Sequence, residues 1–292
     1  MKFAYHHSMC PPEQYLPLTL AAEELGFDTV TMPDSICYPK EASSKYPYNA
    51  DGSREFLDGV PFIEPFVLAS FLAAATKRIR FSTSVQKTAV HEPVLLAKTL
   101  SSLAVMSGNR FDFGIGISPW AEDFEVANTP WEKRGKRLTE MMQILNGLMS
   151  GEYFGFEGEI FSLPEIKLCP VPTIRPKLLV GGHSKPALRR AAKYGDGWIA
   201  AGGSVEEIRT LVEGIQVLRK EYGTDNKPFE FQAMTAAAYS PDGITQLEEI
   251  GVTEVIVAFR DVYAKEPDDK SIDEKRAMLE WYASEIIAKS AA

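Results

Sequence analysis

Short apolar runs alternate along the chain with longer segments in which apolar residues recur at helical spacing. The short runs have the length of buried strands, and the longer segments are typical of helices that bury one face. Residues 92–106, for example, place Val94, Leu95, Leu100 and Leu103 for one helix face. Strands are expected at residues 2–5, 27–32, 79–85, 110–117, 177–180 and 198–201, within 229–239, and at 254–259. Helices are expected at residues 12–25, 64–75, 92–106, 131–149, 186–194, 205–222, 242–250 and 272–289.

Eight strand–helix units of uniform composition predict an α/β fold, a closed (β/α)8 TIM barrel that forms a single domain over residues 1–292. An open doubly wound sheet is the alternative, but it would carry a glycine fingerprint after the first strand. The sequence HHSMCPP follows that strand instead. Three irregular insertions interrupt the rhythm: residues 36–63 after strand two, 118–129 after strand four, and 151–175 before strand five, the last with a hairpin around 155–158.

Charge and cysteine content narrow the possible partners and location. The net charge is −9 and lysines and arginines are scattered, so we expect neither nucleic acid nor an anionic membrane as a partner. Cys10, Cys37 and Cys169 are far apart and odd in number, which favours a reducing, cytoplasmic compartment over a disulfide framework. The longest apolar stretch, residues 65–76, is too short to span a bilayer, and the N-terminus has no apolar signal core.

Residues 176–202, PKLLVGGHSKPALRRAAKYGDGWIAAG, form a complete strand–turn–helix–strand unit. Gly181 and Gly182 end the first strand, Ser184 can cap the helix, and Pro186 suits its first turn. A glycine pair ahead of a helix start exposes backbone N–H groups that, with the helix dipole, suit a phosphate. An ordinary turn between strand and helix explains the same residues equally well, because no complete GxGxxG or P-loop pattern is present.

Active residues of such barrels lie where the strands end and the following loops begin. His6 and His7 are adjacent on strand one, so they point to opposite faces and only one can enter the barrel. His91 precedes the helix at Pro93, where a structural and a catalytic role are equally compatible with the sequence. With only His183 besides, a histidine-rich metal site is not expected, although a metal-dependent barrel hydrolase stays an alternative that a metal assay would test.

The chain resembles the luciferase-like monooxygenase superfamily and, within it, the flavin- and deazaflavin-dependent oxidoreductases. The matching stretches run in consistent order from about residue 21 to residue 201, and the C-terminal third matches only in general pattern. They are AAEELGFDTVTMPDS, AAATKRIRFSTSV, EPVLLAKTLSSLAVMSGNRFDFGIGISPW, EDF followed by RGKRLTEM, and RPKLLVGGHSKPALRRAAKYGDGWIAA.

The resemblance implies a barrel that binds coenzyme F420, or alternatively FMN, at its C-terminal mouth. The tricyclic ring would lie across strands three and four, and the phosphate would lie at the turn 181–184. There His183 would supply a positively charged contact, or would be a plain turn residue. A non-proline cis peptide bond at Ser84–Val85 would form a bulge behind the ring. Such bonds are rare outside this kind of constrained site. Relatives commonly pair through barrel helices, so a homodimer is expected.

The same resemblance assigns the reactive end of the site to the insertion after strand two. Asp34 would hydrogen-bond the ring, or else cap the loop. Ser35 stands where many relatives have a histidine, and a serine cannot act as a general acid at neutral pH without help. Tyr38, Tyr46 and Tyr48 could donate a proton from a lid, although isolated loop tyrosines more often pack or lie at the surface.

The loop ISPWAEDF after strand four would lie beside the cofactor and substrate. There Trp120 would stack on a ring, and Glu122 would accept a proton or hydrogen-bond the cofactor. The alternative is a tryptophan that packs the loop and an exposed glutamate at the start of an acidic helix. Lys87, just past strand three, would meet an anionic group of the cofactor or substrate, or would be solvated.

The function expected from the resemblance is hydride transfer between F420 and a small organic substrate. The aromatic content of the insertions suggests that this substrate is partly apolar. Deazaflavin is preferred because SKYPYNADGSREFLDGVPFIEPF, SPWAEDF and GGHSKPALRRAA resemble a deazaflavin-associated branch. An FMN-dependent monooxygenase is the first alternative. A barrel that binds a flavin or deazaflavin without catalysis is the second, and Ser35 favours it.

Overall fold

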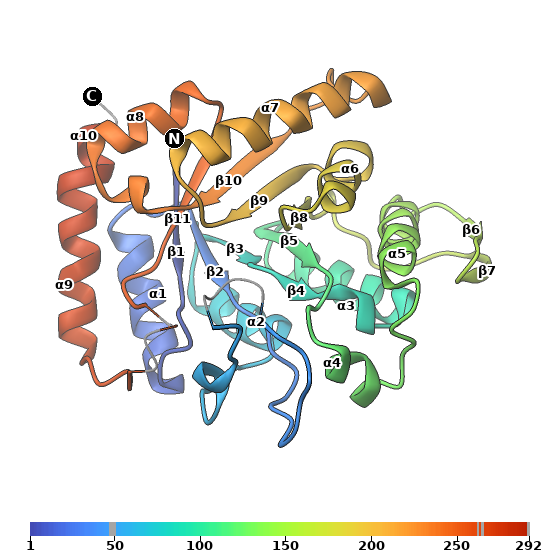
Figure 1. Ribbon diagram of the computed structural model, residues 1–292, viewed down its shortest axis with the longest axis horizontal. Helices are drawn as coiled ribbons and strands as arrows, with labels where there is room; N and C mark the ends of the chain where they lie inside the picture. Colours follow the sequence, from blue (N-terminus) through green and yellow to red (C-terminus); the bar gives the residue numbers. More distant parts are fainter. Residues whose placement is uncertain (47–50, 262, 264–265, 291–292) are drawn as a thin grey trace.

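A computed structural model describes residues 1–46, 51–261, 263 and 266–290 of the chain. Within these residues, parallel strands form a closed ring that is surrounded by helices, which confirms the expected (β/α)8 TIM barrel (Figure 1). The pairing of β3 with β5 closes the ring, with Phe81 opposite Phe111. The eight barrel strands are β1 (Lys2–His6), β2 (Thr29–Met32), β3 (Arg80–Thr83), β5 (Phe111–Gly116), β8 (Leu178–Gly181), β9 (Gly197–Ala201), β10 (Glu230–Met234) and β11 (Glu254–Val257).

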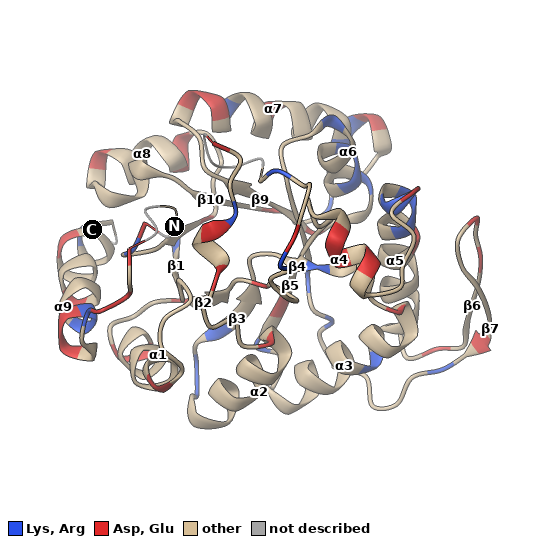
Figure 2. Ribbon diagram, turned by 60° about the horizontal axis from the view of Figure 1, so that its bottom comes forward, with Lys and Arg blue, Asp and Glu red and all other residues tan. Residues whose placement is uncertain are grey.

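The helices that follow the strands form the outer ring of the molecule (Figure 2). Seen from this side, they enclose the strands, and their charged residues lie mostly on the outside. They are α1 (Tyr15–Glu24), α2 (Pro65–Ala75), α3 (Pro93–Met106), α5 (Arg134–Leu148), α6 (Lys185–Tyr194), α7 (Val205–Tyr222), α8 (Pro241–Glu249) and α9 (Ile272–Tyr282). Short 3-10 turns lie at Pro12–Gln14, Glu55–Leu57, Thr88–Val90 and Ala236–Tyr239. None of the described helices is both long and apolar enough for a membrane crossing.

The three insertions occur where they were expected, but their content differs. Residues 118–129, after strand four, were expected to be irregular, but they contain a helix, α4 (Ala121–Val126). Six residues are too few to show helical periodicity, although acidic residues in its first turn favour a helix start. The hairpin before strand five consists of β6 (Phe154–Glu157) and β7 (Ser162–Ile166), so its turn lies after Gly158.

Several elements begin or end at other residues than the sequence predicts. The expected third strand, residues 79–85, ends at Thr83 and resumes as a two-residue strand, β4 (Gln86–Lys87). Helix α5 begins three residues later than expected because Lys133 has a left-handed backbone with φ of 55°. The closing helix changes after α9 into a π-helical segment, Ala283–Ile287, before a last short helix, α10 (Ala288–Ser290).

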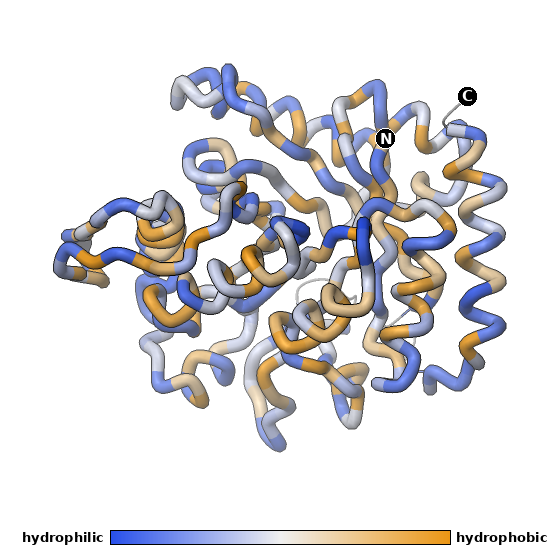
Figure 3. The backbone as a smooth tube through the Cα atoms, turned by 180° about the vertical axis from the view of Figure 1, so that it is seen from behind, coloured by the Kyte–Doolittle hydropathy of each residue, from blue (hydrophilic) through white to orange (hydrophobic). Residues whose placement is uncertain are grey.

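Helices α2 and α3 present apolar side chains to the outside. Helix α2, PFVLASFLAAA, is apolar along its whole length (Figure 3), and Val67 and Phe71 are 65% and 56% exposed. The expectation that Leu95 lies on the buried face of α3 is wrong, since it is 70% exposed. Leu100 and Leu103 face the barrel as expected. An apolar outer surface on two adjacent helices is unusual for a monomer.

The inside of the barrel is filled by small and medium apolar side chains. Ala4, Leu179, Ile199 and Ile256 form a separate buried cluster at the centre of the ring, and Val85 packs against it. A larger core lies between the strands and the helices, where rings such as those of Trp198, Tyr282 and Phe81 are fully buried. The central cluster separates a polar lower end of the barrel from the mouth at the C-terminal ends of the strands.

A buried glutamate and glutamine lie at the lower end, near the strand N-termini. Gln232 on β10 donates from Nε2 to Oε2 of Glu254 on β11 at 2.7 Å. The Oε1 atoms of both side chains are buried and have no hydrogen-bond partner among the described residues. Burial raises the pKa of Glu254 to about 7, and the nearby charge of Glu230 adds to the shift. A protonated Glu254 would donate to the amide oxygen and satisfy both atoms.

Candidate active site

The floor of the barrel mouth is shaped by Val85 and two glycines. The Ser84–Val85 peptide bond is cis, as the resemblance implied. Val85 faces the ends of β5 and β8: a Cβ atom added at Gly116 would lie 2.7 Å from Val85 Cγ2, and one added at Gly181 would lie 2.9 Å from Val85 Cγ1. Real side chains essentially never come so close, so both positions require glycine unless Val85 moves. The result is a floor without projecting side chains on these two strands.

The turn from β8 to α6 places backbone donors at the edge of this floor. Gly182 has a φ of +108°, a conformation that glycine adopts readily. Ser184 is the residue that precedes α6, but its side chain makes no capping hydrogen bond, which corrects the expectation that it caps the helix. In the described part of the chain, no acceptor contacts the N–H of Gly182, Ser184 or Lys185. Such unpaired donors at the start of a helix form a ready anion site.

His183 does not carry the expected positive charge. Its Nε2 atom accepts a hydrogen bond from the N–H of Ala201 at 3.2 Å, which requires the neutral tautomer with the proton on Nδ1. Burial lowers the pKa of His183, although the carboxylate of Glu207 acts in the opposite direction. The indole N–H of Trp198 donates to the carbonyl of Gly182 at 2.9 Å and fixes the turn from below. The turn therefore presents neutral donors and no histidine charge.

A buried ion pair joins the end of β4 to helix α4. The Lys87 ammonium lies 2.8 Å from Oδ2 of Asp123 on α4, and both side chains are nearly inaccessible. Ser118 also donates to that Asp123 oxygen. The ammonium lies 3.5 Å from the hydroxyl oxygen of Ser35. Lys87 is therefore neither solvated nor unpaired: it links the position of the missing histidine to the loop after strand four.

Asp34 is held by the same segment. Its Oδ2 atom accepts a hydrogen bond from the backbone N–H of Lys87 at 2.8 Å. Burial raises the pKa of Asp34, and the hydrogen bond and the charge of Lys87 only partly oppose this. Through this hydrogen bond, the Asp34 carboxylate joins the loop after β2 to β4. Sequence reasoning identified Asp34, Ser35 and Lys87 but missed Asp123, because nothing in EDF distinguishes it from Glu122.

Glu122 holds the insertion after β2 in place. Its Oε1 atom accepts from the backbone N–H groups of Ser43 at 2.8 Å and Ser44 at 3.2 Å. Burial opposes ionisation, but the hydrogen bonds from Ser44 and Ser43 outweigh it and lower the pKa of Glu122 to about 2. A carboxylate of such low basicity is poorly suited to accept a proton at neutral pH. Its hydrogen bonds hold the insertion after β5 against the insertion after β2.

Trp120, in the insertion after β5, packs against the insertion after β2. Only 4% of its surface is exposed, and its ring stacks on Tyr46 with centroids 5.3 Å apart and a 16° interplanar angle. The guanidinium of Arg54 lies 5.6 Å from the indole centroid and 5.2 Å from the ring centroid of Tyr38. These contacts match the packing interpretation of Trp120. Tyr48, the third tyrosine considered as a proton donor, lies outside the described residues.

The histidines are distributed as strand alternation predicts. His6 points into the barrel, where its Nδ1 atom lies 2.8 Å from Oγ1 of Thr31. His7 points outward and bonds Thr19 of α1, also at 2.8 Å. His91 contacts Gln86 through Nε2 at 2.8 Å, a structural contact. Among the described residues, no three His, Cys, Asp or Glu side chains are grouped in a way that could hold a metal ion.

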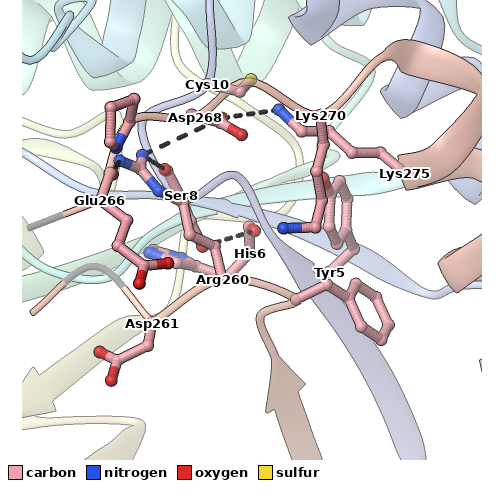
Figure 4. Close-up of a pocket in the computed structure, with 12 residues that line it drawn as sticks. Tyr5, His6, Ser8, Cys10, Arg260, Asp261, Glu266, Asp268, Lys270 and Lys275 are labelled. Atoms are coloured by element: carbon pink, nitrogen blue, oxygen red, sulfur yellow. Dashed lines mark hydrogen bonds and ion pairs between the residues drawn. The ribbon is translucent and has the colours of Figure 1, made fainter. Parts of the chain in front are cut away.

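A polar cavity of about 140 Å³ opens beside β1 and β11 (Figure 4). His6 lines it together with charged side chains from the segment after β11. Arg260 donates to the carbonyl of Ser8 at 3.1 Å, and Lys275 pairs with Asp268 at 2.6 Å. Sequence reasoning missed this side of the mouth, because the C-terminal third resembles the superfamily only in general pattern.

The mouth fits a flat cofactor with a phosphate group. A ring system can lie against the glycine floor at Gly116 and Gly181, with Val85 behind it. Helix N-terminal donors at Ser184 and Lys185 lie at one edge, and the cluster of Asp34 and Lys87 lies past β2 and β3 at another. Flavins and deazaflavins have this combination of a flat tricycle and a phosphate. Neither requires a metal ligand set.

Comparison with known proteins agrees with this geometry. The model of the luciferase-like monooxygenase family matches residues 3–276. The uncharacterized protein Rv0940c of Mycobacterium tuberculosis is 46% identical over 289 residues, 99% of this chain and all of that protein. The F420-dependent glucose-6-phosphate dehydrogenase of Microbacterium testaceum is 26% identical over 257 residues, 85% of this chain and 71% of that enzyme.

Among solved structures, the monooxygenase RslO1 from Streptomyces bottropensis superimposes with a TM-score of 0.78 at 16% identity, over 99% of both chains. This likeness concerns the fold alone. The family match covers nearly the whole barrel, including every strand that contributes to the mouth. The chain therefore belongs to the luciferase-like monooxygenase family, whose members are oxidoreductases and monooxygenases that depend on F420 or FMN.

Proposed function

We propose that this protein is an F420-dependent oxidoreductase that transfers hydride between the deazaflavin and a small, partly apolar organic substrate. The observation that carries the proposal is the glycine floor against Val85, beside the N–H groups of Gly182, Ser184 and Lys185, which no described acceptor contacts. The choice of F420 over FMN rests on similarity to an F420-dependent dehydrogenase along 85% of the chain. When bound, the deazaflavin supplies the hydride chemistry, and the protein positions it and excludes water.

Each part of the mouth has a separate task in this proposal. Gly182 and Ser184 bind the phosphate through backbone N–H groups, and Val85 supports the ring. Asp34 and Ser35 lie at the reactive end. The ion pair of Lys87 with Asp123 fixes Ser35, while Glu122 and Trp120 hold the two insertions together over the site. Substrate would enter between these insertions.

Turnover of F420 tests this function. Oxidised F420 mixed with alcohols would lose the absorbance of the oxidised deazaflavin as it accepts hydride. Reduced F420 mixed with carbonyl and unsaturated compounds would gain that absorbance as it donates hydride. An FMN-dependent monooxygenase is the alternative favoured by the family description, and it would consume oxygen with reduced FMN. A binding protein without catalysis is favoured by Ser35, and it would bind F420 but turn over no member of the panel.

The turn 181–184 yields a prediction about affinity. Replacing Gly182, whose φ is +108°, with alanine should disturb the donors and weaken F420 about ten- to a hundredfold, the equivalent of one hydrogen bond to a charged group. Fluorescence titration of F420 measures the change. Gly26→Ala is the matched control, because Gly26 has a φ of +88°, its added Cβ meets nothing within 4 Å, and it lies at the end of α1. Equal weakening by both variants would contradict a phosphate role for the turn.

We further propose a homodimer that buries the outer surface of α2 and α3. Phe71 and Val67 on α2, and Leu95 and Met106 on α3, are more than half exposed, and helix α2 is apolar on all sides. Phe71→Glu should therefore shift the protein from dimer to monomer in size-exclusion chromatography with light scattering. Val217→Glu on α7, at a position with the same 56% exposure, should leave the dimer intact. A wild-type monomer would refute the proposal.

Location and domain organisation complete the proposal. Cys10, Cys37 and Cys169 all have free thiols. This supports a reducing compartment, the cytoplasm, for the protein. Residues 1–292 would act as one domain, with F420 and a small organic molecule as its ligands and neither nucleic acid nor membrane as a partner.

A further inference from the structure

His6 is a titratable side chain in the layer of the barrel mouth that lies directly above the central cluster. Side chains two residues apart on a strand share a face, so the residues that follow the central cluster by two positions form the next layer toward the mouth. Gly181 on β8, Ala201 on β9 and Ala258 after β11 occupy three of these positions. His6, two residues after Ala4 on β1, occupies the fourth, and it alone of these four has a titratable side chain.

The His6 ring has a fixed orientation. His6 pairs with Thr31 in the register of β1 and β2, and its Nδ1 atom lies 2.8 Å from the Thr31 hydroxyl oxygen. His6 is 92% buried and lines the cavity beside β11 (Figure 4). If Nδ1–H donates to Thr31, the lone pair of Nε2 is available, and no described residue contacts Nε2 with a hydrogen bond. The Thr31 hydroxyl can accept from or donate to Nδ1, so this contact orients the ring, and the Nδ1–H tautomer is the one that leaves the Nε2 lone pair available.

This ring lies beside the segment in which the chain lacks the family histidine. Thr31, which holds His6, precedes Ser35 by four residues on the same strand and loop. Ser35 contacts only the ammonium of Lys87 among the described residues, at 3.5 Å. Strand β1 thus supplies an imidazole to the mouth beside β2, the strand that leads into the loop where the resemblance places a histidine.

We propose that Nε2 of His6 exchanges the proton of the substrate's reacting oxygen, in place of the histidine absent at position 35. This inference rests on the proposed function. When a hydroxyl-bearing carbon is oxidised, its C–H bond breaks and the electron pair leaves as hydride to the deazaflavin. The O–H proton passes to Nε2, and a carbonyl group and an imidazolium remain. The imidazolium then releases its proton to water through the cavity, and reduction runs the same steps backward.

The surroundings of His6 suit such an exchange. Burial lowers the pKa of His6 to about 4, so Nε2 is unprotonated at neutral pH, and its low basicity means that it holds an accepted proton only briefly before passing it on. The other charged groups that line the cavity are Arg260, Asp261, Glu266, Asp268, Lys270 and Lys275. Lys275 pairs with Asp268, and Arg260 lies within 4.0 Å of the same carboxylate. These groups make the cavity that His6 lines polar on the side of the segment after β11.

Imidazole NMR of protein labelled with ¹⁵N-histidine tests the placement without turnover. The chain has four histidines, and His6→Gln and His7→Asn assign the two on strand one. We expect His6 as the Nδ1–H tautomer, with an Nε2 resonance that moves on saturation with F420, while the His7 resonance stays in place. An unmoved His6 resonance in a sample whose absorbance shows bound F420 would overturn the inference. Absence of F420 binding would instead refute the proposed function.

Rate measurements give the second readout. With any compound that turns over, His6→Gln should lower the single-turnover rate by about 10²–10⁴-fold while F420 affinity is unchanged. His6→Asn keeps an amide near Thr31 and removes Nε2, and it replaces the glutamine variant if that variant does not fold. His7→Asn, which removes an equally buried imidazole that faces α1, should keep the wild-type rate. A wild-type rate in a folded His6 variant would overturn the inference.

Discussion

Replacing Lys87 with methionine is expected to lower the free energy of unfolding by about 3–5 kcal/mol, the largest effect predicted for a single side chain. The exposed fractions of the Lys87 and Asp123 side chains are 9% and 2%, and their charged atoms lie 2.8 Å apart. Without the ammonium, the Asp123 carboxylate stays buried with the Ser118 hydroxyl as its described donor. A single neutral donor cannot compensate for a buried charge. Urea denaturation followed by circular dichroism measures the loss.

Two further variants separate burial from charge. Lys133→Met breaks an ion pair with Glu159 of similar length, 2.7 Å, but the two side chains are 62% and 50% exposed. Its cost should be much smaller than that of Lys87→Met, because solvent screens an exposed pair. The double variant Lys87→Met/Asp123→Leu removes both buried charges and should be more stable than Lys87→Met alone. Equal losses in the Lys87 and Lys133 variants would contradict a buried, functionally positioned pair.

Stability is expected to fall by up to about 3 kcal/mol between pH 4.5 and 7 through Glu254 alone. Its pKa is 4.5 in the unfolded chain and is raised to about 7 in the barrel, chiefly by burial. Between these values the folded state holds a proton that the unfolded state has released, so rising pH favours unfolding. Below pH 4.5 both states hold the proton, and above pH 7 neither does. The loss is therefore confined to this window.

Glu254→Gln tests this assignment. A glutamine donates permanently to the Gln232 oxygen that has no partner among the described residues, as the protonated acid would. Its unfolding free energy, measured by urea titration from pH 4.5 to 8, should therefore lack the part of the decline due to Glu254. Glu159→Gln, an exposed position in the hairpin turn, should retain the full decline. A decline of equal size in Glu254→Gln and the wild type would show that Glu254 is not the group responsible.

The order of elements followed from the hydrophobic pattern, because buried strands and one-sided helices have different periods. The pattern failed where the element was too short to display its period or where both faces were apolar. Helix α4 has too few residues to display a period. Leu95 has the spacing of a core residue, but it lies on the outer face of α3, beside an α2 that is itself apolar on all sides.

The site was less accessible to sequence reasoning, because its contacts depend on closure of the barrel. Alternation showed that His6 and His7 face opposite ways, but only the pairing of β1 with β2 shows that His6 is the inner one. The partner of Lys87, Asp123, lies on α4, in a segment that was expected to be irregular. Glu254 begins an ordinary apolar strand, and its burial arises only when β11 pairs with β1 and β10. The cis peptide bond at Ser84–Val85 was expected only from the resemblance to the family.

We propose that the glycine floor and the turn 181–184 bind F420 in preference to FMN. Parallel equilibrium titrations of the purified protein with oxidised F420 and with FMN, followed by absorbance and fluorescence under the same conditions, test it most directly. We expect saturable F420 binding with a lower dissociation constant than that of FMN, weakened by Gly182→Ala and unaffected by Gly26→Ala. Tighter binding of FMN, or no binding of either cofactor, would contradict it.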